Sequence, residues 1–309
     1  MRDRALRAAD RAGTAAGLTT AVVVLMAGFA LIGVGVAGAG GAVAGIAVAA
    51  VLTAVVYACC DRLALSAMLA RPVSEVEQPE LYRLVRELSK AARLPVPRLY
   101  MSPAEQPNSF TVGRGPRTAT VCCTEGLLRV LDEAELRGVL GHELAHVSGH
   151  DILAASMSAG LATVITFPAA LVRLARPGSR RPGVPAARAA GGSGSGLGRA
   201  ESLLTLAFGS MAAVLVRLAV SPEHEYRADA IAALLTGDPV ALASALRKAD
   251  AGVYGSAELP LAPDGRRLSV GHLMLVGPFR LEGVARLLAT HPPAAERVRR
   301  LEALAGYRR

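Results

Sequence analysis

Three histidines and a glutamate fall within nine positions of the stretch LRGVLGHELAHVSGHD, which runs from Leu136 to Asp151. On a helix, the spacing H-E-x-x-H places His142 and His146 one turn apart on the same face, within reach of one tetrahedral metal ion. Glu143 follows the first histidine, and in this motif such a glutamate takes a proton from the attacking water. The pattern predicts a metal-dependent hydrolase.

Two imidazoles leave such a site incomplete, so a further ligand must come from elsewhere. His150 follows His142 by eight residues, whereas the metzincin pattern places its third histidine ten residues after the first. Downstream, the segment SPEHEYRADA places Glu225 and Asp229 one helical turn apart. One carboxylate can bind a metal while the other orients a ligand histidine through its free ring N–H. The alternative for this pair is a solvated acidic face.

The composition of the whole chain is typical of a membrane protein. Of its 309 residues, 52% are hydrophobic and 4% aromatic, and it contains no tryptophan. The net charge of +9 lies largely beside apolar segments, which suits anionic lipid headgroups better than nucleic acid. The cysteines form two adjacent pairs, 59–60 and 122–123, without the spacing of a zinc or redox motif. We expect reduced thiols that pack in apolar surroundings.

No charged residue lies between Arg11 and Asp61. About 20 apolar residues cross a bilayer, so this length predicts two helices, at roughly 16–35 and 41–60, joined by a glycine-rich turn at 33–41. A signal peptide is the competing interpretation, but its apolar region is far shorter. Arginines flank both ends of the segment, which places both ends in the cytoplasm. Residues 1–62 are therefore interpreted as a basic leader and a transmembrane hairpin.

Residues 75–150 have the pattern of soluble α/β structure, and residues 63–151 are interpreted as the first part of the catalytic domain. Helical spacing of Leu and Val predicts a helix at 80–94, and alternating residues predict strands at 97–103 and 118–128. Asp132, with Glu135 three residues later, is the expected N-cap of the helix that carries the histidines.

Residues 152–220 predict a second hydrophobic hairpin. Its apolar parts, 152–172 and 202–220, enclose a Pro/Gly/Ser-rich linker at 173–201 that contains six arginines. Arginines in an outer loop contradict the positive-inside rule, so a re-entrant or interfacial pair is the open alternative. Residues 221–309 are predicted to be helical and to complete the catalytic domain.

Four segments in this order resemble the HtpX-type membrane zinc metallopeptidases, which are related to the CAAX prenyl endopeptidases. They are NSFTVG (108–113), the HExxH helix, HEYRADA (224–230) and THPPAAERVRRL (290–301). The resemblance runs from about residue 75 to the C-terminus. It implies a mainly α, membrane-embedded protein with an α+β zincin-type catalytic domain, whose small sheet precedes the HExxH helix. One departure is Pro222, where the family usually has an arginine.

By this resemblance, His142, His146 and Glu225 would bind one Zn²⁺ ion per chain, and Glu143 would be the catalytic base. Asp229 would be the carboxylate that supports the metal ligands.

Two more residues are similar to family residues with a role in catalysis. His291 resembles a histidine that steadies the oxyanion; its alternative role is that of a helix-entry residue before two prolines. Asn108 resembles a residue that contacts the substrate backbone. A peptide-bond hydrolase needs both an activated water and a donor for the developing oxyanion, so these roles are chemically consistent.

The resemblance further implies a multi-pass protein of the bacterial plasma (inner) membrane whose catalytic domain faces the cytoplasm. Its substrates would be peptides or damaged membrane proteins, lying extended against a sheet edge near Asn108. Two rival functions remain at this stage: a metal-dependent hydrolase of a lipidated substrate, and a catalytically inactive zinc-binding membrane scaffold. The sequence leaves the oligomeric state open.

Overall fold

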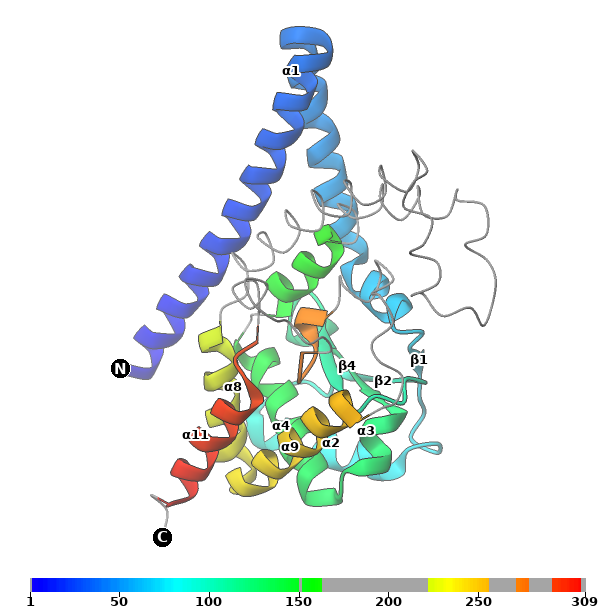
Figure 1. Cartoon of the computed structure of the whole chain (residues 1–309), viewed down its shortest axis with the longest axis vertical. Coiled ribbons are helices and arrows are strands. Elements are labelled where there is room, and N and C mark those ends of the chain that lie inside the picture. Colours follow the sequence, from blue (N-terminus) through cyan, green and yellow to red (C-terminus); the bar gives the residue numbers. More distant parts are fainter. Residues whose placement is uncertain (1, 150–151, 163–221, 256–270, 278–290, 307–309) are drawn as a thin grey trace.

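The computed structural model describes residues 2–149, 152–162, 222–255, 271–277 and 291–306 (Figure 1). A long helical hairpin projects from a domain in which helices surround a small sheet. The predicted linker at 173–201, the apolar segment at 202–220 and residues 163–172 of the apolar segment at 152–172 lie outside the described residues, and so does His150.

The hairpin is formed by α1 (Arg2–Ala67), in which Ala37 and Gly38 are not helical. Gly38 has φ of 59°, a left-handed value that favours glycine. This break lies inside the predicted turn at 33–41. The two arms approach closely near it, because a Cβ atom added at Gly41 would lie 2.0 Å from the carbonyl oxygen of Gly33. Glycines in this stretch therefore serve both the turn and the close contact.

Much of the hairpin surface is apolar, and none of the other described residues covers it. Within the described residues, Ala15–Ala67 is the one helix long and apolar enough to cross a membrane, and only 11% of its most apolar window is buried. Leu31 and Val36 are 72% and 82% exposed. A soluble core helix would bury such residues, so this surface requires an apolar environment.

The sheet has the strand order β1-β2-β4-β3. It consists of β1 (Arg71–Pro72), β2 (Arg98–Ser102), β3 (Ser109–Val112) and β4 (Thr120–Thr124). The predicted strands correspond to β2 and β4, which pair in parallel, while β3 pairs antiparallel with β4. The second strand is shorter than predicted, because residues 125–128 are helical, with Thr124 as the N-cap. Consequently β3 lies at the edge of the sheet, on the side from which the rest of the site is built.

The cysteines pack as free thiols, as the sequence predicts. On β4, Cys122 faces a cluster that includes the base of the hairpin, whereas Cys123 faces the main core. Burial raises the pKa of both thiols above its ordinary value, so they stay protonated and unreactive.

The helix that carries the histidines is α4 (Glu133–Gly149). It begins with the predicted capping box: the Glu135 amide donates to Asp132 Oδ1 at 2.9 Å, and the Asp132 amide donates to Glu135 Oε2 at 3.0 Å. Its buried residues lie on every side, as in a helix at the centre of a domain.

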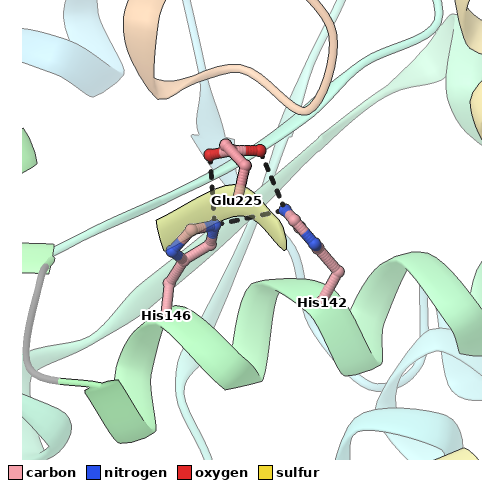
Figure 2. Close-up of side chains that lie close together, drawn as sticks. All are labelled: His142, His146 and Glu225. Carbon is pink, nitrogen blue, oxygen red and sulfur yellow. Dashed lines mark hydrogen bonds and ion pairs between the residues drawn. The ribbon is translucent and has the colours of Figure 1, made fainter. Parts of the chain in front are cut away.

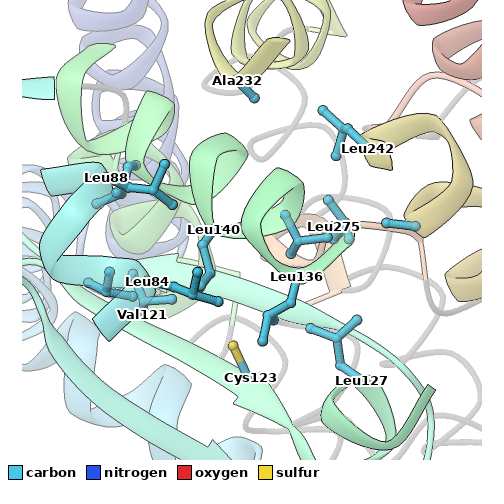
Figure 3. Packing of buried hydrophobic residues seen from close by; sticks show 14 of the residues in the cluster. Leu84, Leu88, Val121, Cys123, Leu127, Leu136, Leu140, Ala232, Leu242 and Leu275 are labelled. Carbon is cyan, nitrogen blue, oxygen red and sulfur yellow. The ribbon is translucent and has the colours of Figure 1, made fainter. Parts of the chain in front are cut away.

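Further helices in the described part of the chain surround α4 or the sheet, among them α2 (Pro79–Ala92), α3 (Glu125–Val130), α8 (Pro222–Thr236), α9 (Pro239–Gly255) and α11 (Ala294–Gly306). Helix α4 packs against α2, α8, α9 and β3, and α11 packs against α8 and α9. Figure 3 shows Leu136 and Leu140 of α4 directed into this core, with Leu242 of α9 nearby. Helix α4 is thus fixed from several directions, and so are its histidines.

The approach of α8 and α9 to α4 depends on glycine. A Cβ atom added at Gly138 would lie 3.1 Å from the Leu242 backbone of α9, and one at Gly141 would lie 3.1 Å from the Thr236 side chain of α8. Gly138 thus allows the close approach of α9, and Gly141 lets α8 lie close enough to α4 for a glutamate side chain to reach the histidines.

Candidate metal centre

Three side chains from two distant segments converge at one point (Figure 2). The Nε2 atoms of His142 and His146 lie 3.1 Å apart. Glu225 lies on the first turn of α8. Its Oε2 is 3.6 Å from His142 Nε2, and its Oε1 is 3.6 Å from His146 Nε2. The structure therefore brings together the ligand set that the sequence and the resemblance predict.

This arrangement fits a tetrahedral cation. Metal–ligand distances of about 2.0–2.1 Å place neighbouring ligands of such an ion roughly 3.3 Å apart, close to the separations seen here. Glu225 Oε2 is buried and, within the described part of the chain, accepts no hydrogen bond. A buried carboxylate oxygen beside two imidazole nitrogens is well suited to a divalent metal such as zinc.

Asp229 lies one turn after Glu225 on α8 and contacts the first histidine. Its Oδ1 is 3.0 Å from His142 Nδ1. When Nε2 faces the metal position, the N–H at Nδ1 donates a hydrogen bond to this carboxylate. That bond fixes the orientation of the ring and increases the basicity of Nε2. The geometry supports the predicted supporting role of Asp229.

Arg297, on α11, is the largest fully buried side chain in the described part of the molecule. Its guanidinium donates from Nε and Nη2 to the two oxygens of Asp229, at 2.8 and 2.7 Å, and its Nη1 lies 3.1 Å from Glu225 Oε2. Sequence reasoning missed this residue. A usable signal was present, because Arg297 lies four residues before the buried Leu301 and therefore on the inward face of an amphipathic helix.

The two carboxylates of α8 remain ionised because of this arginine. Burial opposes ionisation of Glu225, but the charge of Arg297, together with the neighbouring His291 and His146 rings, holds its pKa well below the ordinary value. Burial acts in the same way on Asp229, whose pKa is nevertheless lowered by the charge of Arg297 and by its hydrogen bonds. Both groups are thus kept in the charged form that metal binding requires.

Glu143 is turned toward β3 and is held by two hydroxyl groups. Ser109 Oγ donates to its Oε1, and Thr111 Oγ1 donates to its Oε2, both at 2.6 Å. Ser109 and Thr111 are two residues apart on a strand and so share a face. A carboxylate has about four acceptor positions, so a water can still bind to Glu143. These two hydroxyls were also missed from the sequence, although NSFTVG alternates in the required way.

His291 lies beside the ligand glutamate, with its Nδ1 3.6 Å from Glu225 Oε1. Its side chain is 9% exposed, and among the described residues neither ring nitrogen has a hydrogen-bond partner. A buried imidazole without a partner is costly, and it is available to a ligand that enters the site.

Asn108 is occupied by the chain's own backbone. Its Nδ2 donates to the carbonyl of Val276 at 2.9 Å, and its Oδ1 accepts from the Val276 amide at 3.3 Å. This is the pattern by which an amide side chain holds a peptide, but the peptide is residues 274–276. The predicted contact of Asn108 with a substrate backbone stays a prediction.

The model of peptidase family M48 matches residues 75–305. The chain therefore belongs to peptidase family M48, and it is a metalloprotease that acts on peptide or protein substrates.

Within this family the chain is similar to proteins described as protease HtpX homologs. It is 54% identical to one from Kineococcus radiotolerans over 80% of each chain. Another, from Paenarthrobacter aurescens, is 46% identical over 80% of this chain and 79% of the relative. A third, from Pseudarthrobacter chlorophenolicus, is 43% identical over 92% of each chain. The resemblance drawn from the four motifs is confirmed.

The first prediction concerns Arg297. Replacing it with Met leaves two buried carboxylates without a counter-charge, which is expected to weaken zinc affinity by about 10–100-fold and to lower the unfolding temperature. Zinc affinity is measured by competition with a chromophoric chelator. Arg300→Met, on the same helix but exposed, is the matched control. Unchanged zinc affinity in Arg297→Met would show that the arginine is not needed to hold the carboxylates.

The second prediction concerns the hydroxyls on Glu143. Ser109→Ala and Thr111→Val each remove a charge-assisted hydrogen bond, so each is expected to lower kcat about tenfold with little change in KM or zinc content. Ser109→Thr and Thr111→Ser keep a hydroxyl and should retain most of the activity. Steady-state cleavage of casein gives both constants. Equal losses in the hydroxyl-keeping and hydroxyl-removing variants would point to packing instead.

Proposed function

We propose that this protein is a membrane-bound, zinc-dependent endopeptidase whose active site comprises His142, His146, Glu225 and Glu143. One observation carries the proposal: two histidines of α4 and a glutamate about 80 residues downstream meet with ligand atoms within 4.8 Å of one another. Family membership supports the class of reaction, and the geometry of the three ligands supports the assignment of the metal.

When bound, zinc would polarise the scissile carbonyl and lower the pKa of the attacking water. Glu143 takes a proton from that water and delivers it to the leaving amine, so that no free amide anion has to form. The hydroxyls of Ser109 and Thr111 keep the carboxylate aimed while the proton moves.

His291 is proposed as the donor to the developing oxyanion. Its ring lies beside Glu225, and its nitrogens have no other partner in the described part of the chain. An N–H directed at the position where negative charge develops contributes more in the transition state than in the ground state, which raises kcat. The position of His291, just ahead of α11, links this donor to the helix that carries Arg297.

We also propose that the hairpin spans the plasma (inner) membrane and that the catalytic domain faces the cytoplasm. The arginines on both flanks of α1 support this orientation through the positive-inside rule. A site held at the membrane surface suits membrane-protein substrates, and a role in their quality control agrees with the resemblance to HtpX-type peptidases.

The third prediction tests the catalytic base against the rival scaffold. Glu143→Gln should bind zinc stoichiometrically and lose caseinolysis by at least about 100-fold, since the amide cannot accept the proton. Metal content is measured by atomic emission on detergent-purified protein. Glu133→Gln, exposed on the same helix, is the control. Activity equal to the wild type in Glu143→Gln would exclude this mechanism.

Glu225→Ala completes that experiment, because it should lose both zinc and activity. Stoichiometric zinc in Glu225→Ala would require another third ligand, and His150 would then be the first residue to examine. A chelator should abolish cleavage of casein by the wild type, which a lipid hydrolase would not cleave at all.

The fourth prediction concerns His291. His291→Ala should keep zinc and KM but lower kcat by about 10²–10³-fold, the usual cost of removing one oxyanion donor. His291→Gln retains an N–H donor and should recover part of the loss. If the alanine variant instead loses zinc, His291 acts on the structure of the site and not on the oxyanion.

A further inference from the structure

A cavity of about 600 Å³ lies at the base of the hairpin, and no residue of the candidate metal centre lines it. Its walls come from Tyr57 of α1, from residues 93–95 after α2, and from the loop at 114–118 that follows β3. Three of the lining residues are arginines: Arg93, Arg114 and Arg117.

Among the described residues, no carboxylate balances the charge in this cavity. No Asp or Glu lines it, and within the described residues none of its three arginines forms an ion pair with a carboxylate. The neighbouring Arg98 differs, since it pairs with Asp61 at 3.5 Å. Grouped guanidinium ions repel one another, and their planar donors suit the oxygens of a phosphate.

The cavity lies at the level where the apolar surface of the hairpin ends. Tyr57 stands four residues before Asp61, which is the first charged residue after the uncharged stretch. Val51 and Val55, farther along the same arm, are 62% and 51% exposed. Tyrosine is enriched at the headgroup level of bilayers, and the Arg114 guanidinium lies 5.7 Å from the Tyr57 ring centre.

The walls also include apolar groups. Leu94 and Pro95 line the cavity, and Val96, beside them, is 49% exposed. A free phosphate ion or a nucleic acid backbone has no apolar group to cover this surface. A phospholipid, in contrast, has a phosphate next to a glycerol and acyl chains. Arginines beside apolar residues therefore favour a phospholipid as the ligand.

We propose that this cavity binds the phosphate of an anionic phospholipid, with Arg93, Arg114 and Arg117 as its ligands and Tyr57 beside the glycerol. The inference rests on the proposal that the hairpin spans the membrane. Anionic lipids are concentrated in the cytoplasmic leaflet, the side on which the catalytic domain is proposed to lie.

The fifth prediction tests this site on the full-length chain in a non-ionic detergent. Dioctanoyl-phosphatidylglycerol is titrated in, and binding is measured by native mass spectrometry, with dioctanoyl-phosphatidylcholine as the neutral probe. Each of Arg93→Gln, Arg114→Gln and Arg117→Gln should weaken binding of the anionic lipid about fivefold, and the triple variant about a hundredfold. Phosphatidylcholine should bind more weakly than phosphatidylglycerol and respond little to the substitutions.

The matched control removes the same charge outside the cavity, through a triple variant of Arg71→Gln, Arg86→Gln and Arg129→Gln, and should bind like the wild type. An equal loss in the control, or wild-type affinity in the cavity variant, overturns the proposal. Displacement of the lipid by millimolar inorganic phosphate would identify a free-phosphate site instead and would also overturn it.

Two readouts separate this result from the other proposals. Zinc content and caseinolysis in detergent report the catalytic site, and both should be unchanged in the cavity variants. If the triple variant loses zinc, the single variants decide the test. Retention of the protein in membranes after alkaline carbonate extraction reports whether the hairpin is inserted, independently of lipid binding at the cavity.

Discussion

The central constraint of this structure is the burial of negative charge beneath α4. Glu143, Glu225 and Asp229 are all buried and formally carry three negative charges, whereas Arg297 supplies one positive charge. With neutral histidines, two negative charges remain, and a divalent cation balances them. Buried charges persist only when they are paired or bind metals, so the cation is required by the same electrostatics that the arginine satisfies in part.

This charge balance explains why elements far apart in the chain must meet. Helix α4 provides the histidines, α8 the carboxylates, α11 the arginine and β3 the hydroxyls that hold Glu143. Arg297 also donates to the carbonyl of Leu275 at 2.6 Å, which ties α11 to the segment beside β3. One side chain therefore links the metal ligands to the edge of the sheet.

Sequence reasoning succeeded where local physics decides the structure. The capping box at Asp132, the strands β2 and β4, and the position of the turn in α1 all follow from patterns within a few residues. The ligand pair on α4 follows equally from helical geometry. Assigning Glu225 to the same site as this pair needed the resemblance as well. From spacing alone, the two carboxylates of α8 could equally have formed a solvent-exposed acidic face.

The residues that were missed depend on tertiary contacts. A run of three arginines at 297, 299 and 300 gives no local sign that one is buried and two are exposed, unless the positions of Val298 and Leu301 fix the inward face of the helix. Similarly, Ser109 and Thr111 acquire their role only because α4 lies across β3. Such contacts are set by packing. Sequence periodicity predicts which face of a helix or strand is buried, but not which element packs against it.

The edge of β3, where a substrate strand would add, is occupied by residues of the same chain. Residues 274–276 already lie along it: the Leu275 amide donates to the carbonyl of Ser109 at 2.9 Å, and Met274 pairs antiparallel with Phe110. Asn108 holds Val276 at both polar atoms. A backbone group that is already bonded along this edge is not free for a second strand, so a peptide can add next to Asn108 only if this segment moves. The held segment has the extended, backbone-bonded form that a peptide added to a sheet edge would have.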